Sequence, residues 1–160
     1  MSHDPIWFLN ELVEVLIDGA DTGGTYDAVT FTSPPGDMPP PHVHENESEG
    51  VLVLEGELAV HTAAGSQTLR VGDAIHLPRG EVHTAEVTSA TPARYVVVAV
   101  PAGFVDFVRA VGTPAERHEL PLPDGSPDVE RLERIALEYG ITFVGPTGSR
   151  PADLAQRPAL

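Results

Sequence analysis

Short apolar runs, separated by turn residues about every 8 to 12 positions, are the feature that most constrains this chain, and such spacing favours strands over long helices. The 160 residues include 16 prolines and 15 glycines, spread over most of the length. We therefore expect an all-β sandwich or barrel. The expected strands cover residues 13–17, 26–32, 51–54, 57–62, 68–71, 74–77, 82–88 and 94–100, with a hairpin loop at 63–67.

Two helices are expected beyond the last of these strands. Residues 103–112 carry apolar side chains at helical spacing. A second helix is expected at about 127–139, where Ser126 can cap the start, Pro127 suits the first turn and Gly140 can end it.

A single domain is expected over residues 1–160, because its length is typical of one domain. The sequence is 41% hydrophobic, which is enough to form a core. The expected parts are a barrel core at about 13–100, a helical extension at about 101–145 and a loose tail at about 146–160.

The charge and residue usage exclude several classes of function. There are 24 acidic and 9 basic residues, all of the latter arginine, so the net charge is −15 and nucleic acid is not an expected partner. The absence of cysteine excludes disulfides and thiolate metal sites, and fits a cytoplasmic location. No segment approaches the ~20 apolar residues of a membrane span, and no membrane association is expected.

Two histidines, His42 and His44, flank Val43 directly after three prolines. In an extended strand alternate side chains share a face, so both imidazoles point the same way. Two adjacent imidazoles are costly to bury without a shared partner, and a divalent metal is a natural one.

Glu49 and His83 are expected to point towards the same interior. Glu49 alternates with apolar Val51 and Val53, and His83 lies on the face of its strand opposite to a polar one. Nitrogen and oxygen ligands of this kind suit one divalent transition metal: Fe, Mn, Ni, Co, Cu or Zn. By contrast, Glu45 and Glu47 are expected to be solvated in a turn.

Two longer runs resemble known motifs. Residues 36–56 read GDMPPPHVHENESEGVLVLEG, residues 72–83 read GDAIHLPRGEVH, and residues 57–71 separate them. Both runs resemble the two motifs of the cupin superfamily, except that Val87 stands where the second motif usually closes with Asn. Residues 101–116 bear a less specific resemblance to the C-terminal part of quercetinase-like single-domain cupins.

The resemblance implies a cupin jelly-roll β-barrel, often dimeric, so a homodimer is expected. It also implies that four side chains bind the metal inside the barrel: His42, His44, Glu49 and His83. A role in contacting substrate, or in supporting the ligands, is considered for His76, Tyr26 and Phe31, whereas His61 is expected on the surface.

The main functional hypothesis is a metal-dependent enzyme that acts on a small, largely apolar aromatic substrate. The preferred reaction is quercetinase-like dioxygenation, in which Glu49 is the catalytic base as well as a metal ligand. The redox-free alternative is cyclisation or isomerisation of a polyketide-like aromatic, and a third is a cupin that binds a small molecule without turnover. A sugar isomerase is disfavoured because the strands offer mostly aliphatic side chains.

Overall fold

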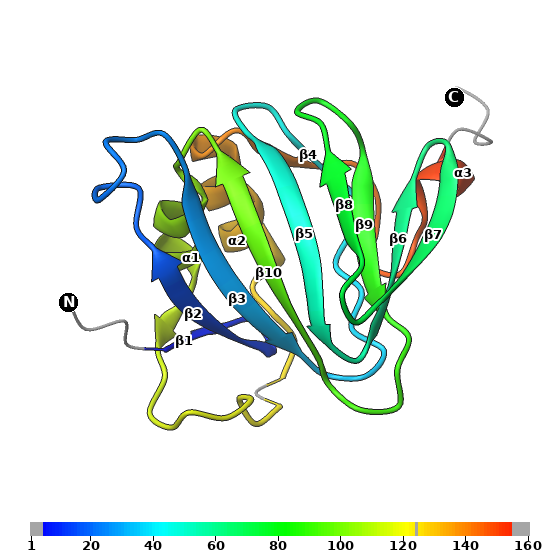
Figure 1. The fold of residues 1–160 in the computed structure, drawn as a ribbon, viewed down its shortest axis with the longest axis horizontal. Helices are drawn as coiled ribbons and strands as arrows, with labels where there is room; N and C mark the ends of the chain where they lie inside the picture. Colours follow the sequence, from blue (N-terminus) through cyan, green and yellow to red (C-terminus); the bar gives the residue numbers. More distant parts are fainter. Residues whose placement is uncertain (1–4, 124, 155–160) are drawn as a thin grey trace.

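Two antiparallel β-sheets face each other in the computed structural model, which describes residues 5–123 and 125–154 (Figure 1). The strands are β1 Ile6–Phe8, β2 Glu11–Ile17, β3 Asp27–Ser33, β4 His42–His44, β5 Ser48–Glu55, β6 Glu57–Thr62, β7 Gly65–Arg70, β8 Ala74–Leu77, β9 His83–Val87, β10 Ala93–Val100, β11 Thr113–Pro114 and β12 Ile141–Phe143. The seven-stranded sheet has the order β11-β1-β2-β3-β10-β5-β8, and the five-stranded sheet has the order β12-β4-β9-β6-β7. The expected all-β class is confirmed.

Each predicted strand appears in the structure. The bounds of β6 and β8 are those expected, and the bounds of the other predicted strands differ by a few residues. The hairpin loop expected at 63–67 is shorter, because Thr62 pairs with Gly65 and β7 begins there. β1, β11 and β12 were not expected. β12 is a short strand that follows Gly140 directly and pairs with β4, so it depends on a tertiary contact.

Two short helices follow the barrel strands, as expected: α1 Phe104–Val111 and α2 Val129–Glu138. A third, α3 Pro151–Leu154, was not expected. The cap of α2 differs from the prediction. Asp128 caps it, accepting a hydrogen bond from the Arg131 backbone N–H at 3.0 Å, and Ser126 lies outside the helix. α3 lies in the part of the chain expected to be a loose tail, and residues 155–160 of that tail lie outside the described residues.

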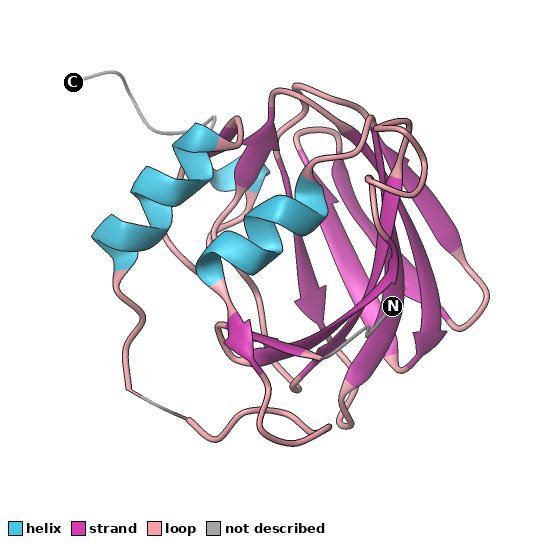
Figure 2. Ribbon diagram, turned by 90° about the vertical axis from the view of Figure 1, so that its left-hand side faces the viewer, coloured by secondary structure: helices cyan, strands magenta, loops and turns pink. Residues whose placement is uncertain are grey.

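The helices bridge the two sheets along one side. α1 packs on β1 and β3 and against α2, and α2 packs on β12 at the edge of the other sheet. Figure 2 shows α1 and α2 next to each other beside the sheets. They bring Phe104, Phe107 and Leu132 into the core, where these residues join the apolar side chains of the strands.

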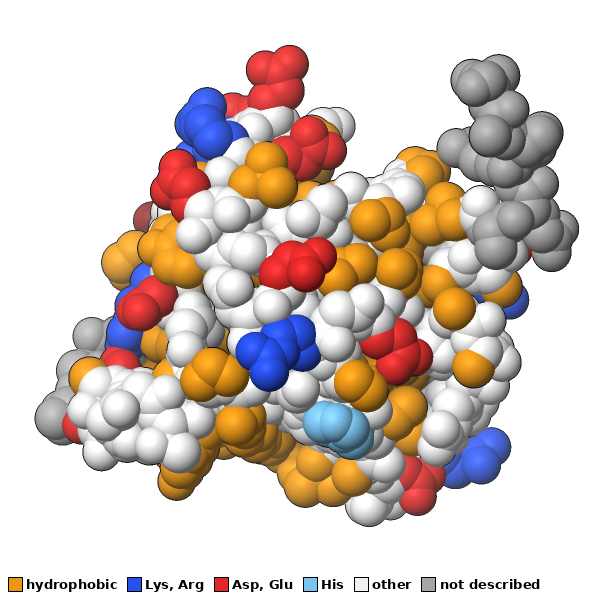
Figure 3. All heavy atoms as spheres, turned by 90° about the horizontal axis from the view of Figure 1, so that it is seen from above, with side chains coloured by type: hydrophobic (Ala, Val, Ile, Leu, Met, Phe, Trp, Pro, Cys, Tyr) orange, Lys and Arg blue, Asp and Glu red, His pale blue; other side chains and the backbone are white. Residues whose placement is uncertain are grey.

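The surface mixes apolar and charged side chains. On the face seen in Figure 3, apolar patches alternate with acidic side chains and a few arginines. Among the described residues, no helix has the length and apolar character needed to cross a bilayer.

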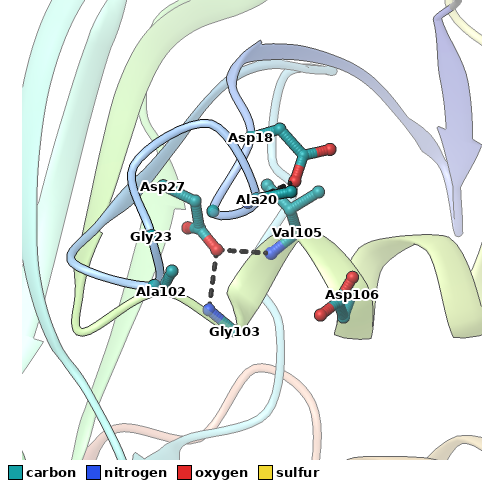
Figure 4. A pocket seen from close by; sticks show the side chains of 10 residues that line it. Asp18, Ala20, Gly23, Asp27, Ala102, Gly103, Val105 and Asp106 are labelled. Carbon is teal, nitrogen blue, oxygen red and sulfur yellow. Dashed lines mark hydrogen bonds between the residues drawn. The ribbon is translucent and has the colours of Figure 1, made fainter.

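A buried aspartate fixes the start of α1. Gly103 and Val105 donate their backbone N–H groups to Asp27 Oδ2 at 2.8 and 3.1 Å, so that a side chain of β3 caps the helix (Figure 4). Asp27 is 1% exposed, and its burial raises the pKa of the carboxyl group, partly offset by the two N–H donors. Phe104 lies between the two donors, so this contact positions its ring.

We predict that Asp27→Ala lowers the free energy of unfolding by about 2–4 kcal/mol, because two N–H groups lose their acceptor. Asp27→Asn keeps an oxygen acceptor, and we expect it to cost less than about 1 kcal/mol. Urea denaturation measures both, with Asp21→Ala in the loop that precedes β3 as an exposed control. Equal stability of Asp27→Ala and the wild type would show that the cap contributes nothing.

Candidate metal centre

Strand pairing brings together the four side chains predicted as metal ligands. β4 carries His42 and His44 on one face. β9 pairs with β4 at His42 and His83, so these two residues lie directly opposite each other. Glu49 comes from β5 in the facing sheet. The set therefore joins both layers of the fold.

The ligand atoms lie close enough to share one cation. One ring nitrogen from each of the three histidines lies within 4.8 Å of the others. Glu49 Oε2 lies 3.0 Å from His83 Nε2 and 3.4 Å from His44 Nε2. The side chains of His44, Glu49 and His83 are buried, so the contacts are shielded from water.

The second nitrogen of each imidazole is held by an acceptor. His42 Nδ1 is 2.8 Å from the Pro40 carbonyl, His83 Nδ1 is 3.2 Å from the Glu81 carbonyl, and His44 Nδ1 is 2.6 Å from Glu47 Oε1. Each Nδ1–H therefore donates to its acceptor, and each Nε2 can bind a metal once it carries no proton. This arrangement orients histidine ligands in metalloproteins. The donor set of three imidazoles and one carboxylate thus fits a divalent transition metal.

The electrostatics of these side chains also favour a bound cation. Burial, together with His83 and His44, lowers the pKa of His42 to about 3, so its imidazole is neutral as a ligand must be. Burial opposes ionisation of Glu49, but the hydrogen bond to His83 and the charge of His44 lower its pKa to about 2. Burial likewise opposes a charge on His44, yet Glu47 and Glu49 raise its pKa. Two carboxylates therefore attract positive charge to this point.

The four side chains line a cavity of about 130 Å³ between the sheets. Most of its wall is apolar, with aromatic rings contributed by Phe8, Phe31, Phe104, Phe107 and Phe143. The Phe104 ring packs against His44, with the ring centroids 5.7 Å apart. A molecule in this cavity would contact the candidate ligands at one place and aromatic or aliphatic side chains over most of its remaining surface.

Of the three other residues considered for substrate contact, one lines the cavity and two do not. Phe31 lines the cavity, as considered. Tyr26 does not line it: β3 begins one residue later, and Tyr26 is 37% exposed in the preceding loop. His76 does not line it either, because it alternates with Ile75 and Leu77 on β8 and points to solvent, whereas Leu77 faces the cavity.

The expectation for His61 also needs correction. It lies on the face of β6 opposite to Leu58 and Val60, as expected, but it is only 2% exposed. Its ring nitrogens lie 2.6 Å from Ser66 Oγ and 3.1 Å from Glu86 Oε2. α3 packs against β6, which explains why this face is covered.

Glu47 was expected to be solvated, and this expectation is wrong, because the side chain is only 4% exposed. Its turn is docked on the end of α2: Asn46 Nδ2 donates to the Tyr139 carbonyl at 3.0 Å and the Glu45 N–H donates to the Gly140 carbonyl at 2.8 Å. A signal was present, because Glu47 continues the inward alternation of Glu49 and the valines of β5.

Two further polar residues of the cavity were not expected. Glu11, the first residue of β2, and Tyr95, near the start of β10, both line it. Neither belongs to a recognisable motif, and their inward orientation depends on how the strands pair. The cavity therefore carries polar groups beyond the candidate ligands.

Comparison with known proteins identifies the family. Residues 29–99 match the cupin domain. Quercetin 2,3-dioxygenase from Bacillus subtilis (strain 168) is 31% identical over 126 residues, which cover 79% of this chain and 36% of that protein. Germin-like protein subfamily 2 member 2 from Arabidopsis thaliana is 41% identical over 64 residues, covering 37% of this chain and 29% of that protein. The chain thus spans about a third of the length of the curated relatives it matches.

A solved structure agrees at the level of the fold. An RmlC-like cupin from Shewanella frigidimarina NCIMB 400 superposes with a TM-score of 0.52 at 22% identity, covering 62% of this chain and 85% of that chain. The sequence match to the cupin domain and the shared fold together show that this chain belongs to the cupin superfamily, with a weaker resemblance to quercetinase-like cupins.

Proposed function

We propose that this cupin is a metal-dependent enzyme that acts on a small, largely apolar aromatic molecule by quercetinase-like dioxygenation. The observation that carries the proposal is the fixed orientation of the three imidazoles, each with Nδ1 held by an acceptor and Nε2 available beside Glu49. Such an arrangement is needed to hold a metal and has no role in packing an apolar core.

The cavity favours a particular kind of substrate. Its wall is mostly aromatic and aliphatic, which suits an apolar ring better than a sugar. Its volume of about 130 Å³ is below the roughly 300–1,000 Å³ of pockets that enclose drug-sized ligands. We therefore propose a substrate with one aromatic or enolic ring, smaller than a flavonol.

The proposed ligands are His42, His44, Glu49 and His83. A divalent transition metal held by them would supply Lewis acidity and, if it is redox-active, dioxygen chemistry. Glu49 is also proposed to take the proton from a substrate hydroxyl, since it is the carboxylate nearest to the point on which the imidazoles converge. The phenylalanines exclude water and orient the ring of the substrate.

The similarity to quercetin 2,3-dioxygenase extends over most of this chain and supports the choice of reaction. The redox-free alternative is cyclisation or isomerisation of an aromatic, and it uses the same proposed ligands and the same cavity. A requirement for dioxygen therefore distinguishes dioxygenation from this alternative. We also propose that the protein is a cytoplasmic homodimer.

We predict that His83→Ala loses most of the bound metal while the barrel remains folded, because one of the four ligands is removed. The measurement is metal content per chain after purification without chelator, with circular dichroism as the check on folding. His76→Ala is the matched control, since His76 is exposed on β8. Full metal occupancy in His83→Ala would refute the ligand assignment.

We predict that Glu47→Gln weakens metal affinity about 10-fold or more, because His44 Nδ1–H loses a charged acceptor. Competition with a chromophoric chelator measures the dissociation constant. Glu45→Gln changes an exposed glutamate in the same turn and should leave the affinity unchanged. Equal affinities of the two variants would show that Glu47 does not support the centre.

We predict that the metal-loaded protein consumes dioxygen in the presence of a single-ring enol such as a 3-hydroxy-4-pyranone, and does so faster than with quercetin. An oxygen electrode measures uptake, and Glu49→Gln should abolish it because the carboxylate is lost both as ligand and as proton acceptor. Turnover that is unchanged under strict anaerobiosis would replace dioxygenation by the redox-free reaction. Tight binding without turnover would support a binding protein.

A further inference from the structure

A second polar cluster lies at the ends of β2, β3 and β10, which are neighbours in the seven-stranded sheet (Figure 1). Two of its residues, Glu11 and Tyr95, line the same cavity. Ser33 Oγ donates to Glu11 Oε1, Tyr95 OH lies 3.0 Å from Ser33 Oγ, and Tyr95 OH donates to Glu11 Oε1 at 3.3 Å. The Tyr95 ring stacks on Phe31, with centroids 5.5 Å apart and planes at 11°. We call Glu11, Ser33 and Tyr95 the hydroxyl cluster.

The strand register places the hydroxyl cluster away from the candidate metal centre. On β10, Ala99 pairs with Glu49 of β5 and Tyr95 pairs with Val53. Glu49 and Val53 are four residues apart on one strand, so the two backbone positions are separated by roughly 13 Å. Glu49 and Tyr95 both line the cavity, so a substituted ring lying between them would meet polar groups at both of its ends.

The hydrogen bonds within the hydroxyl cluster can use all of its O–H donors and leave an acceptor unfilled. Ser33 and Tyr95 each have one O–H group, and both of these can be used on Glu11 Oε1. The phenol oxygen of Tyr95 then keeps lone pairs that no O–H of the cluster fills. A ligand that donates a hydrogen bond satisfies this oxygen, whereas a methyl group at the same place leaves it unpaired and buried.

The surroundings of Glu11 indicate how the donors are arranged. Burial, followed by the charge of Asp37, raises the pKa of Glu11 well above its usual range. Asp37 is itself held by Asn10, whose Nδ2 donates to Asp37 Oδ1 at 2.7 Å. Glu11 Oε1 accepts hydrogen bonds from both hydroxyl groups, of Ser33 and of Tyr95.

We propose that the hydroxyl cluster is a second subsite of the cavity, which accepts a hydrogen bond from a hydroxyl group at the far end of a substrate anchored at the candidate metal centre. The substrate is then a hydroxylated, otherwise apolar ring compound with an oxygen ligand at one end and an O–H donor at the other. This inference rests on the proposed function, because it requires the substrate to be anchored by a bound metal.

The test compares two probes of nearly equal shape, 4-(hydroxymethyl)catechol and 4-ethylcatechol. Zinc-loaded full-length protein is used under anaerobic conditions, since zinc has no redox chemistry, and calorimetry measures the dissociation constants. The wild type should bind the hydroxymethyl probe roughly tenfold more tightly, the effect expected for one buried hydrogen bond. Tyr95→Phe keeps the ring on Phe31 and should abolish this preference, and Glu11→Gln should reduce it.

Tyr26→Phe removes the same hydroxyl group from a tyrosine outside the cavity and should keep the tenfold preference. If a variant fails to fold, the comparison of the two probes on the wild type still tests the subsite. Equal affinity for the two probes, or no binding of either probe to the zinc-loaded protein, would contradict the proposed subsite. An unchanged preference in Tyr95→Phe also overturns it. A protein that takes up no zinc overturns the proposed function instead, and the metal analysis made before the titration distinguishes the two failures.

Discussion

The pairing of β4 with β9 is the constraint on which the candidate centre depends. It places His42 opposite His83, while the alternation of β4 sets His44 beside them. A slip of one residue in β9 would turn His83 towards the opposite face and leave two imidazoles without the third. β12 pairs with the other edge of β4, so the strand that carries two of the histidines is held on both sides.

The helical segment supports this geometry at two points. The end of α2 holds the turn of residues 45–47, and this turn directs Glu47 onto His44. Asp27 caps α1 and so fixes Phe104, whose ring packs against His44. The residues beyond the barrel strands therefore help to orient His44 as well as to cover the core.

The strands that alternate apolar and polar residues could be predicted from the sequence. So could the convergence of the candidate ligands, because these residues have a recognisable spacing. Glu49 was recognised because Val51 and Val53 share its face, and the same reasoning extended by one step would have found Glu47. β12 was missed because a three-residue strand has almost no pattern of its own. Tyr95 could not be assigned to the cavity, since a register shift of β10 against β5 begins beside it.

The cavity has two polar ends that differ in chemistry. At one end, lone pairs of nitrogen and a carboxylate converge, which favours a cation. At the other, Tyr95 presents an acceptor beside Glu11, a carboxyl group whose pKa is raised by burial, and this end favours a neutral hydrogen-bond donor. The apolar wall between them stabilises a flat ring without fixing its direction. In the proposed function, the polarity difference between the two ends would therefore determine which end of a substrate meets the metal.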